Sequence, residues 1–142
     1  MKIGFKRGNN VWSSINRYLL RTQWSHSVVE INGRLYESSA LKGNKYRAGV
    51  RDYELTEDEA SHYWWIDLGN DNDSEALARY ELCRGHGYDY FSLIPFALPV
   101  QVRDSKREYC HELTLFLMTG IEGKGYKTPE IILTHVLRKM MT

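Results

Sequence analysis

The sequence predicts an α+β domain in which strands come first and most helices follow. Two strand-like runs flank Asn32-Gly33, a dipeptide that is typical of a two-residue hairpin turn. Two helix starts lie in the second half of the chain, one at Cys110 and one at Thr128-Pro129. Runs of strands followed by helices indicate an α+β fold.

Five segments of the first half are expected to form strands, because they alternate apolar with polar residues or are rich in β-branched and aromatic ones. They are residues 2–6, 25–31, 34–38, 46–55 and 63–68. Between the first two, Val11, Ile15 and Tyr18 recur at helical spacing. This spacing predicts an amphipathic helix that ends near Thr22.

Two further helices are expected between the strands and Cys110. The polar cluster at residues 70–74 predicts the N-cap of a helix over residues 75–84, which Gly85 ends. The aromatic segment 88–97 predicts a short helix, and Pro99 then requires a loop.

Length and composition indicate one folded domain over residues 1–142. The formal net charge is +1, which does not favour a nucleic-acid partner, and no apolar run approaches the roughly 20 residues that cross a bilayer. Residues 1–7 lack a hydrophobic signal core, and two cysteines are too few for a disulfide framework. We therefore expect a cytoplasmic protein with no transmembrane segment.

Cys110 is the most informative residue, because it stands where a helix should begin. The following residues 113–118 are almost entirely apolar, and Gly120 is a natural helix stop. A thiol in the first turn of a helix lies near unpaired backbone N–H groups and the positive end of the helix dipole. This setting favours the thiolate, the nucleophilic form of cysteine. The backbone N–H of Cys110 is the expected oxyanion donor.

A thiolate nucleophile needs a base, and His26 at the start of a predicted strand is the candidate. Glu37 lies across the hairpin, where a carboxylate would orient the imidazole and favour its protonated form. His111 adjoins Cys110, but it points about 100° away around the helix and is a poor candidate base. The expected catalytic residues are therefore Cys110, His26 and Glu37.

Two motifs, in this order, resemble those of a known family. Residues 25–37, Ser-His-Ser-Val-Val-Glu-Ile-Asn-Gly-Arg-Leu-Tyr-Glu, resemble its histidine strand, hairpin and third polar position, and residues 109–113, Tyr-Cys-His-Glu-Leu, resemble its cysteine helix. The family is the circularly permuted branch of the NlpC/P60 papain-like cysteine peptidases, which includes YiiX/YaeF-like bacterial proteins and lecithin:retinol acyltransferase. His111 stands where serine is common, and Ser27-Val28 replaces the usual Val-Gly.

The resemblance implies a papain-like fold, with an antiparallel sheet or small barrel packed against helices and the cysteine at a helix N-terminus. It implies a hydrolase that cleaves a peptide, isopeptide or other amide bond through a Cys-His-Glu triad and a thioester. Expected substrates are peptides, peptidoglycan fragments or acyl compounds, and a bacterial or bacteriophage source fits such a chain. The alternatives are an acyltransferase or thioesterase acting on lipid esters, and a catalytically silent binding or assembly module.

Other residues have two interpretations. Trp24 and Tyr109 are candidate substrate-binding residues, and core packing is the alternative for both. Cys83 and His86 have a Cys-x-x-His spacing, but without a second pair this is weak for a metal site. We therefore expect no metal and no cofactor.

Overall fold

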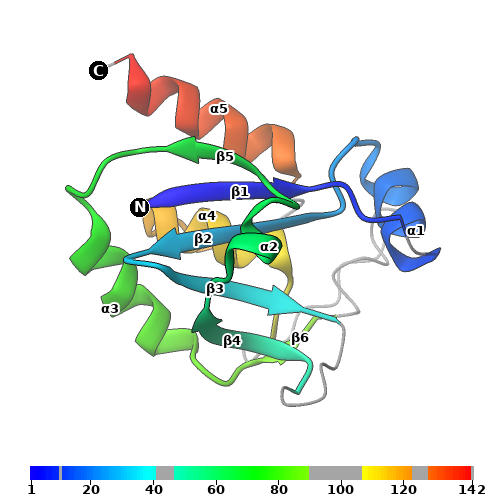
Figure 1. Cartoon of the computed structure of the whole chain (residues 1–142), viewed down its shortest axis with the longest axis horizontal. Coiled ribbons are helices and arrows are strands. Elements are labelled where there is room, and N and C mark those ends of the chain that lie inside the picture. Colours follow the sequence, from blue (N-terminus) through cyan, green and yellow to red (C-terminus); the bar gives the residue numbers. More distant parts are fainter. Residues whose placement is uncertain (10, 41–46, 90–106, 123–127, 142) are drawn as a thin grey trace.

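A five-stranded antiparallel sheet forms the centre of the fold, and the chain is α+β (Figure 1). The structure is a computed structural model that describes residues 1–9, 11–40, 47–89, 107–122 and 128–141. The strand order is β4-β3-β2-β1-β5. The strands are β1 (Lys2–Lys6), β2 (His26–Ile31), β3 (Arg34–Ser39), β4 (Gly49–Glu54) and β5 (Trp64–Asp67).

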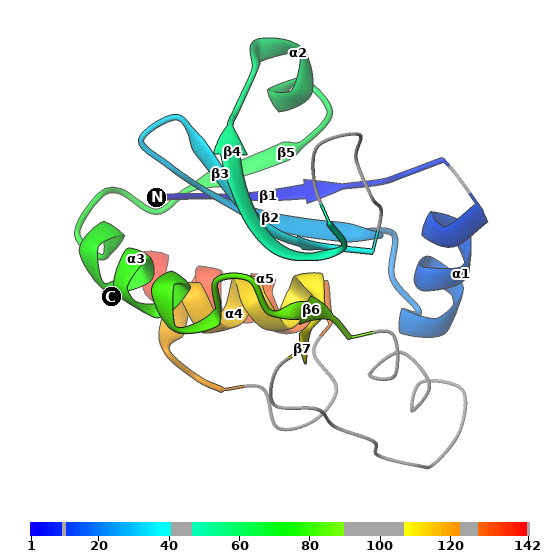
Figure 2. The ribbon, with the colours of Figure 1, turned by 90° about the horizontal axis from the view of Figure 1, so that it is seen from below.

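Helices lie on both sides of this sheet. They are α1 (Val11–Leu20), α2 (Glu57–Ala60), α3 (Asp73–Cys83), α4 (Cys110–Thr119) and α5 (Pro129–Met140). Figure 2 shows α3, α4 and α5 on one side, α2 on the other, and α1 beyond one end of the strands. None of the helices in the described part of the chain is both long and apolar enough to cross a membrane.

The hairpin between β2 and β3 fixes the register of the two strands that concern the site. Asn32 and Gly33 both have positive φ angles, of 52° and 78°, as a two-residue hairpin turn requires. The register pairs Val29 with Tyr36. Continued by one residue, it places Glu37 opposite Val28. Because side chains alternate along a strand, Glu37 and His26 then share one face of the sheet as diagonal neighbours.

The two faces of β2 have different surroundings. Val28 packs with Leu35 and Tyr63 on the face that bears α2. Val29 and Ile31 join the larger core, together with the apolar residues of α4. Eight of the ten residues of α4 are buried, so this helix is the central element of the core.

The structure confirms the predicted order of strands and helices. The five predicted strands, the helix after β1, the helix at residues 75–84 and both later helices are present, with ends that differ by a few residues. Gly120 has a φ of 74° and ends α4, as expected. Asn72 and Thr128 stand at N-cap positions, although neither side chain makes a capping hydrogen bond.

One sequence expectation needs correction, and three short elements were not predicted. Tyr88 lies in a two-residue strand, β6 (Gly87–Tyr88), rather than in a helix, because it pairs in parallel with β7 (Arg107–Glu108). Residues 90–97 of that expected helix lie outside the described residues. The helix α2 has four residues, too few for a periodic pattern, and its only sequence signal is the Thr56 cap that accepts from Glu59 N.

We expect Leu117→Ala to lower the free energy of unfolding by about 2–5 kcal/mol, because this α4 side chain is fully buried and its removal leaves a cavity. Leu82→Ala in α3 is the matched control. Its side chain is 73% exposed, so the same change should stay within about 0.5 kcal/mol. Urea unfolding of the three proteins measures both values, and equal effects would contradict the central place of α4.

Candidate active site

Cys110 is the first residue of α4. Tyr109 before it has extended backbone angles, and Tyr109 O accepts from Leu113 N at 3.1 Å to close the first helical turn. The backbone N–H groups of this turn have no acceptor within the helix. Cys110 itself is buried, with 2% of its surface exposed. The nucleophile candidate therefore lies where the helix dipole favours a negative charge.

His26 is the first residue of β2 and meets Cys110 at one end of the sheet. Figure 2 shows the first turn of α4 beneath the start of β2, at the end nearest α1. The backbone of His26 pairs with Lys6 of β1, and 19% of its side chain is exposed. The imidazole thus has contact with solvent, whereas the thiol is covered.

Glu37 of β3 holds the His26 ring. Its Oε2 lies 2.6 Å from His26 Nε2. Its Oε1 accepts from Arg51 Nε at 2.8 Å and Nη2 at 2.6 Å. The Tyr53 hydroxyl lies 3.4 Å from the same oxygen and closer, at 2.8 Å, to Glu59 Oε1, to which it donates. Since Nε2 of His26 is engaged by Glu37, Nδ1 is the nitrogen that can exchange a proton with Cys110.

Arg51 and Tyr53 were not identified from the sequence. Both lie on β4, and the register places Arg51 directly opposite Glu37. Because Arg51 and Tyr53 are two residues apart on β4, both side chains lie on the same face of the sheet as the Glu37 carboxylate. The alternation of residues 50–54 shows which side chains of this strand share a face. It could not indicate that Arg51 and Tyr53 lie beside Glu37 until the pairing of β3 with β4 was known.

The charges at the site stabilise one another. Burial opposes the charged form of Glu37, but the hydrogen bond and charge of His26, together with the charge of Arg51, lower the pKa of this carboxyl to about 2. Burial also opposes the charged form of His26. The interactions with Cys110 and Glu37 outweigh that effect and raise the pKa of His26 to about 10. Glu37 is therefore a carboxylate, and His26 an imidazolium, near neutral pH.

The pKa of the Cys110 thiol lies well below its ordinary value. Burial raises this pKa, but the neighbouring imidazoles of His111 and His26 lower it by more. The favoured state is a thiolate beside imidazolium, the reactive form of a cysteine nucleophile.

A second polar cluster lies beneath Cys110. Ser27 Oγ is 2.7 Å from His111 Nδ1, 3.0 Å from Thr114 Oγ1 and 3.4 Å from Cys110 O. Thr114 Oγ1 donates to Cys110 O at 3.0 Å. His111 is fully buried, and its described side-chain hydrogen bond is to Ser27. No sequence signal indicated the contacts of Ser27 and Thr114, because they depend on how α4 packs against β2.

The two predicted substrate-binding residues occupy packed positions. Trp24 is partly buried and stacks on Trp64, with ring centroids 5.6 Å apart and planes 7° apart, and it also packs on Phe5. Tyr109 is 1% exposed and meets the His111 ring edge-on at 6.0 Å. Packing, the alternative interpretation, is thus observed for both, and contact with a substrate stays a prediction.

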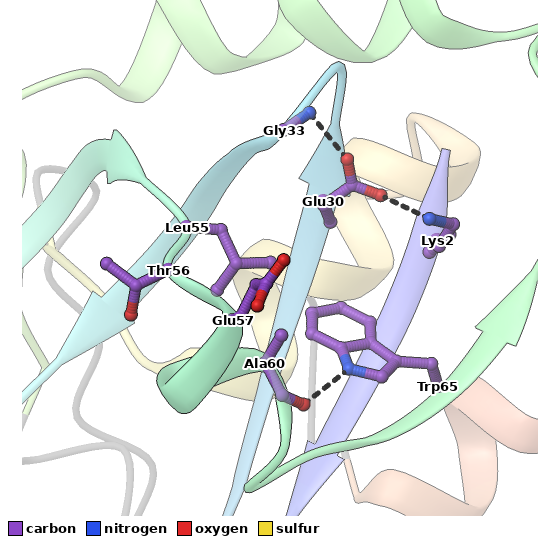
Figure 3. Close-up of a pocket in the computed structure, with 8 residues that line it drawn as sticks. All are labelled: Lys2, Glu30, Gly33, Leu55, Thr56, Glu57, Ala60 and Trp65. Atoms are coloured by element: carbon purple, nitrogen blue, oxygen red, sulfur yellow. Dashed lines mark hydrogen bonds and ion pairs between the residues drawn. The ribbon is translucent and has the colours of Figure 1, made fainter.

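A cavity of about 330 Å³ lies elsewhere, at the hairpin end of β2 (Figure 3). Its lining includes Glu30, Gly33 and Trp65, but none of the three predicted catalytic residues. Glu30 binds Gly33 N and Lys2, and Trp65 Nε1 donates to Ala60 O, so these polar groups already have partners within the protein (Figure 3).

The Cys83 side chain is buried at the end of α3. Its Sγ lies 3.5 Å from Arg79 O and 3.4 Å from Tyr80 O, as expected of a thiol packed at a helix end. Over the described residues, no three or more His, Cys, Asp or Glu side chains form a group that could hold a metal ion.

Comparison with known proteins adds no relative: no protein-family model matches this chain, and no curated protein sequence matches it. The resemblance to the permuted NlpC/P60 branch accordingly stays a prediction from the sequence. The positions of Cys110, His26 and Glu37 are the observations from which the chemistry can be inferred.

Proposed function

We propose that this protein is a cysteine hydrolase that cleaves a peptide, isopeptide or other amide bond, with Cys110, His26 and Glu37 as its catalytic triad. The observation that carries the proposal is the joint state of Cys110 and His26. A thiol at a helix start has a pKa well below its ordinary value, beside an imidazole that a carboxylate holds at 2.6 Å. Nucleophile, base and orienting group of this kind are the parts that acyl transfer requires.

The reaction begins with attack of the Cys110 thiolate on the carbonyl carbon of the substrate. The carbonyl π pair moves to oxygen, and the resulting oxyanion accepts a hydrogen bond from the backbone N–H of Cys110. His26 then gives its Nδ1 proton to the amine as the C–N bond breaks, which leaves a thioester on Cys110.

Water completes the cycle. His26, now neutral, takes a proton from water as the water oxygen attacks the thioester carbon. The C–S bond breaks, the carboxylic acid leaves, and the thiolate–imidazolium pair returns. Glu37 holds the ring in place throughout, and Arg51 keeps Glu37 ionised.

The order of elements supports a papain-like domain of the permuted kind. The histidine strand precedes the cysteine helix in the chain, and α4 packs against the sheet that contains β2. The polar residue on the next strand, Glu37, engages the histidine. Peptides, peptidoglycan fragments and acyl compounds are the substrate classes that the resemblance implies.

The first test is turnover of a panel of peptide amides, peptidoglycan stem peptides and acyl esters. We expect Cys110→Ala to lower turnover by about a thousandfold or more, because no other group supplies the nucleophile. Glu37→Gln should lower it by at least about tenfold through loss of the charge that orients His26. Cys83→Ala, the matched control, should turn over substrate as the wild type does.

Two outcomes would overturn this proposal. One is an absence of turnover for every member of the panel, which would favour a binding or assembly role. The other is undiminished turnover in a folded Cys110→Ala variant. Turnover confined to the acyl esters would assign the site to esters in place of amides.

The pH dependence of turnover is the second test. The thiolate is lost as pH falls through the low pKa of Cys110, and the imidazolium proton is lost as pH rises through about 10. We therefore expect a bell-shaped profile of kcat/KM with its alkaline limb near pH 10. A profile that rises only above pH 8, as for an ordinary thiol with a pKa of about 8.5, would contradict the ion pair.

A further inference from the structure

One side of α1 (Val11–Leu20) presents apolar side chains to solvent. Val11, Ile15 and Tyr18 are 74%, 40% and 83% exposed. At about 100° per residue around the helix axis, these three positions fall within an arc of about 60°. They form one exposed apolar stripe, which we call the α1 stripe. A helix of a globular domain normally buries such a stripe against a core.

The opposite side of α1 fixes the helix to the rest of the fold. Ser13 and Arg17, four residues apart, share that side of the helix. Arg17 Nη1 donates to Gly8 O, and Ser13 lies so close to Gly8 that a Cβ there would collide with Ser13 Oγ. Gly8 N donates in turn to Ser25 Oγ at 2.8 Å. The α1 stripe therefore faces away from the backbone that anchors the helix.

The segment around α1 is basic and contains no acidic residue. Residues 1–29 hold five of the nineteen Lys and Arg residues and none of the eighteen Asp and Glu residues. Residues 30–142, with fourteen basic and eighteen acidic residues, have a formal net charge of −4. Arg7 and Arg21, which flank α1, are exposed, and neither forms an ion pair with a carboxylate of the described residues. By contrast, Arg34 and Arg51 on the sheet both do.

An anionic bilayer surface matches both features of this region. Apolar side chains on one side of an amphipathic helix enter the boundary between headgroups and acyl chains, and nearby Arg and Lys residues bind anionic headgroups. A second copy of this chain would bring two basic segments together, and like charges oppose that contact. Nucleic acid would bind the arginines through its phosphates but would leave the α1 stripe without an apolar partner.

We propose that α1 is a docking surface for an anionic lipid bilayer, with the α1 stripe at the headgroup boundary and Arg7 and Arg21 on the headgroups. The inference goes beyond the proposed function and does not depend on it. Figure 2 shows α1 beyond the end of the sheet at which β2 begins, where His26 and the first turn of α4 meet. Docking would therefore hold the candidate active site close to the membrane surface.

The test is sedimentation of the full chain with lipid vesicles. Vesicles of phosphatidylcholine alone are compared with vesicles of equal parts phosphatidylcholine and phosphatidylserine. We expect binding to the second kind to be at least about tenfold tighter, because several basic residues act together at the anionic surface. At an ionic strength of about 1 M, where the Debye length is about 3 Å, this preference should be lost.

One pair of double variants tests the apolar part of the surface. Val11→Ser with Tyr18→Ser removes two exposed side chains of the α1 stripe. Leu137→Ser with Met140→Ser makes the matched change at exposed positions of α5, a helix with an acidic residue in its first turn. We expect the α1 change to weaken binding by about tenfold or more, and the α5 change to leave it as in the wild type.

A second pair tests the charges. Arg7→Gln with Arg21→Gln removes two positive charges beside α1, and Arg138→Gln with Lys139→Gln removes two from the last turn of α5. Both variants have the same net charge. We expect the first to weaken binding to the phosphatidylserine vesicles by about tenfold or more, and the second by less than about threefold. Circular dichroism checks that every variant is folded.

Three outcomes would overturn the inference. One is a wild-type protein that stays in the supernatant with both kinds of vesicle. Another is loss of binding in the α5 variants while the α1 variants bind fully. The third is loss of binding in Arg7→Gln with Arg21→Gln but full binding in Val11→Ser with Tyr18→Ser, which would indicate a site for any polyanion, such as nucleic acid.

The outcome is separable from that of the proposed function. Cys110→Ala leaves α1 unchanged and should bind vesicles as the wild type does. Vesicle binding without turnover of any substrate would refute the hydrolase alone. Turnover by a protein that does not bind vesicles would refute the docking surface alone.

Discussion

The packing of α4 against β2 is the constraint on which the rest of the site depends. Eight of ten α4 residues are buried, so the helix cannot turn or slide without exposing apolar surface. That burial fixes the first turn of α4, and with it Cys110, at the end of the sheet where β2 begins. The hairpin at Asn32-Gly33 fixes the other part of the candidate site, because it places Glu37 diagonally across from His26. Two ordinary structural features thereby bring together residues that are far apart in the chain.

The charges along this end of the sheet alternate in sign. Arg51, Glu37, His26 and Cys110 follow one another as cation, anion, cation and anion, and each partner lowers the free energy of its neighbour's charged form. In isolation, each of these groups would shift toward its neutral form when buried. The alternation accounts for a pKa of Cys110 well below its ordinary value at a position with 2% exposure, where desolvation alone would raise it.

The sequence allowed the elements of the fold to be predicted, because its turn and cap signals are local. Asn32-Gly33, Gly85 and Gly120 mark their boundaries directly, and each has the positive φ that only a few residue types adopt readily. It also allowed Cys110, His26 and Glu37 to be proposed, since their motifs are short and contiguous. Arg51, Ser27 and Thr114 could not be found this way, because their roles arise from pairings between β3 and β4 and between β2 and α4. Helical periodicity alone could not show the partner of His111 either, because its hydrogen bond with Ser27 also depends on the packing of α4 against β2.

The polar cluster of Ser27, His111 and Thr114 lies in a contact between β2 and α4 that is otherwise largely apolar. Ser27 shares its face of β2 with Val29 and Ile31, and Thr114 and His111 share α4 with Leu113, Leu115 and Leu117. Apolar side chains at these three positions would fill the same space without leaving Nε2 of His111 lacking a partner, and replacements of this kind are often neutral or stabilising. A local arrangement that stability does not require is expected where a site has a chemical task. Here the cluster ends at the carbonyl of Cys110, so the residue to which it is joined is the proposed nucleophile.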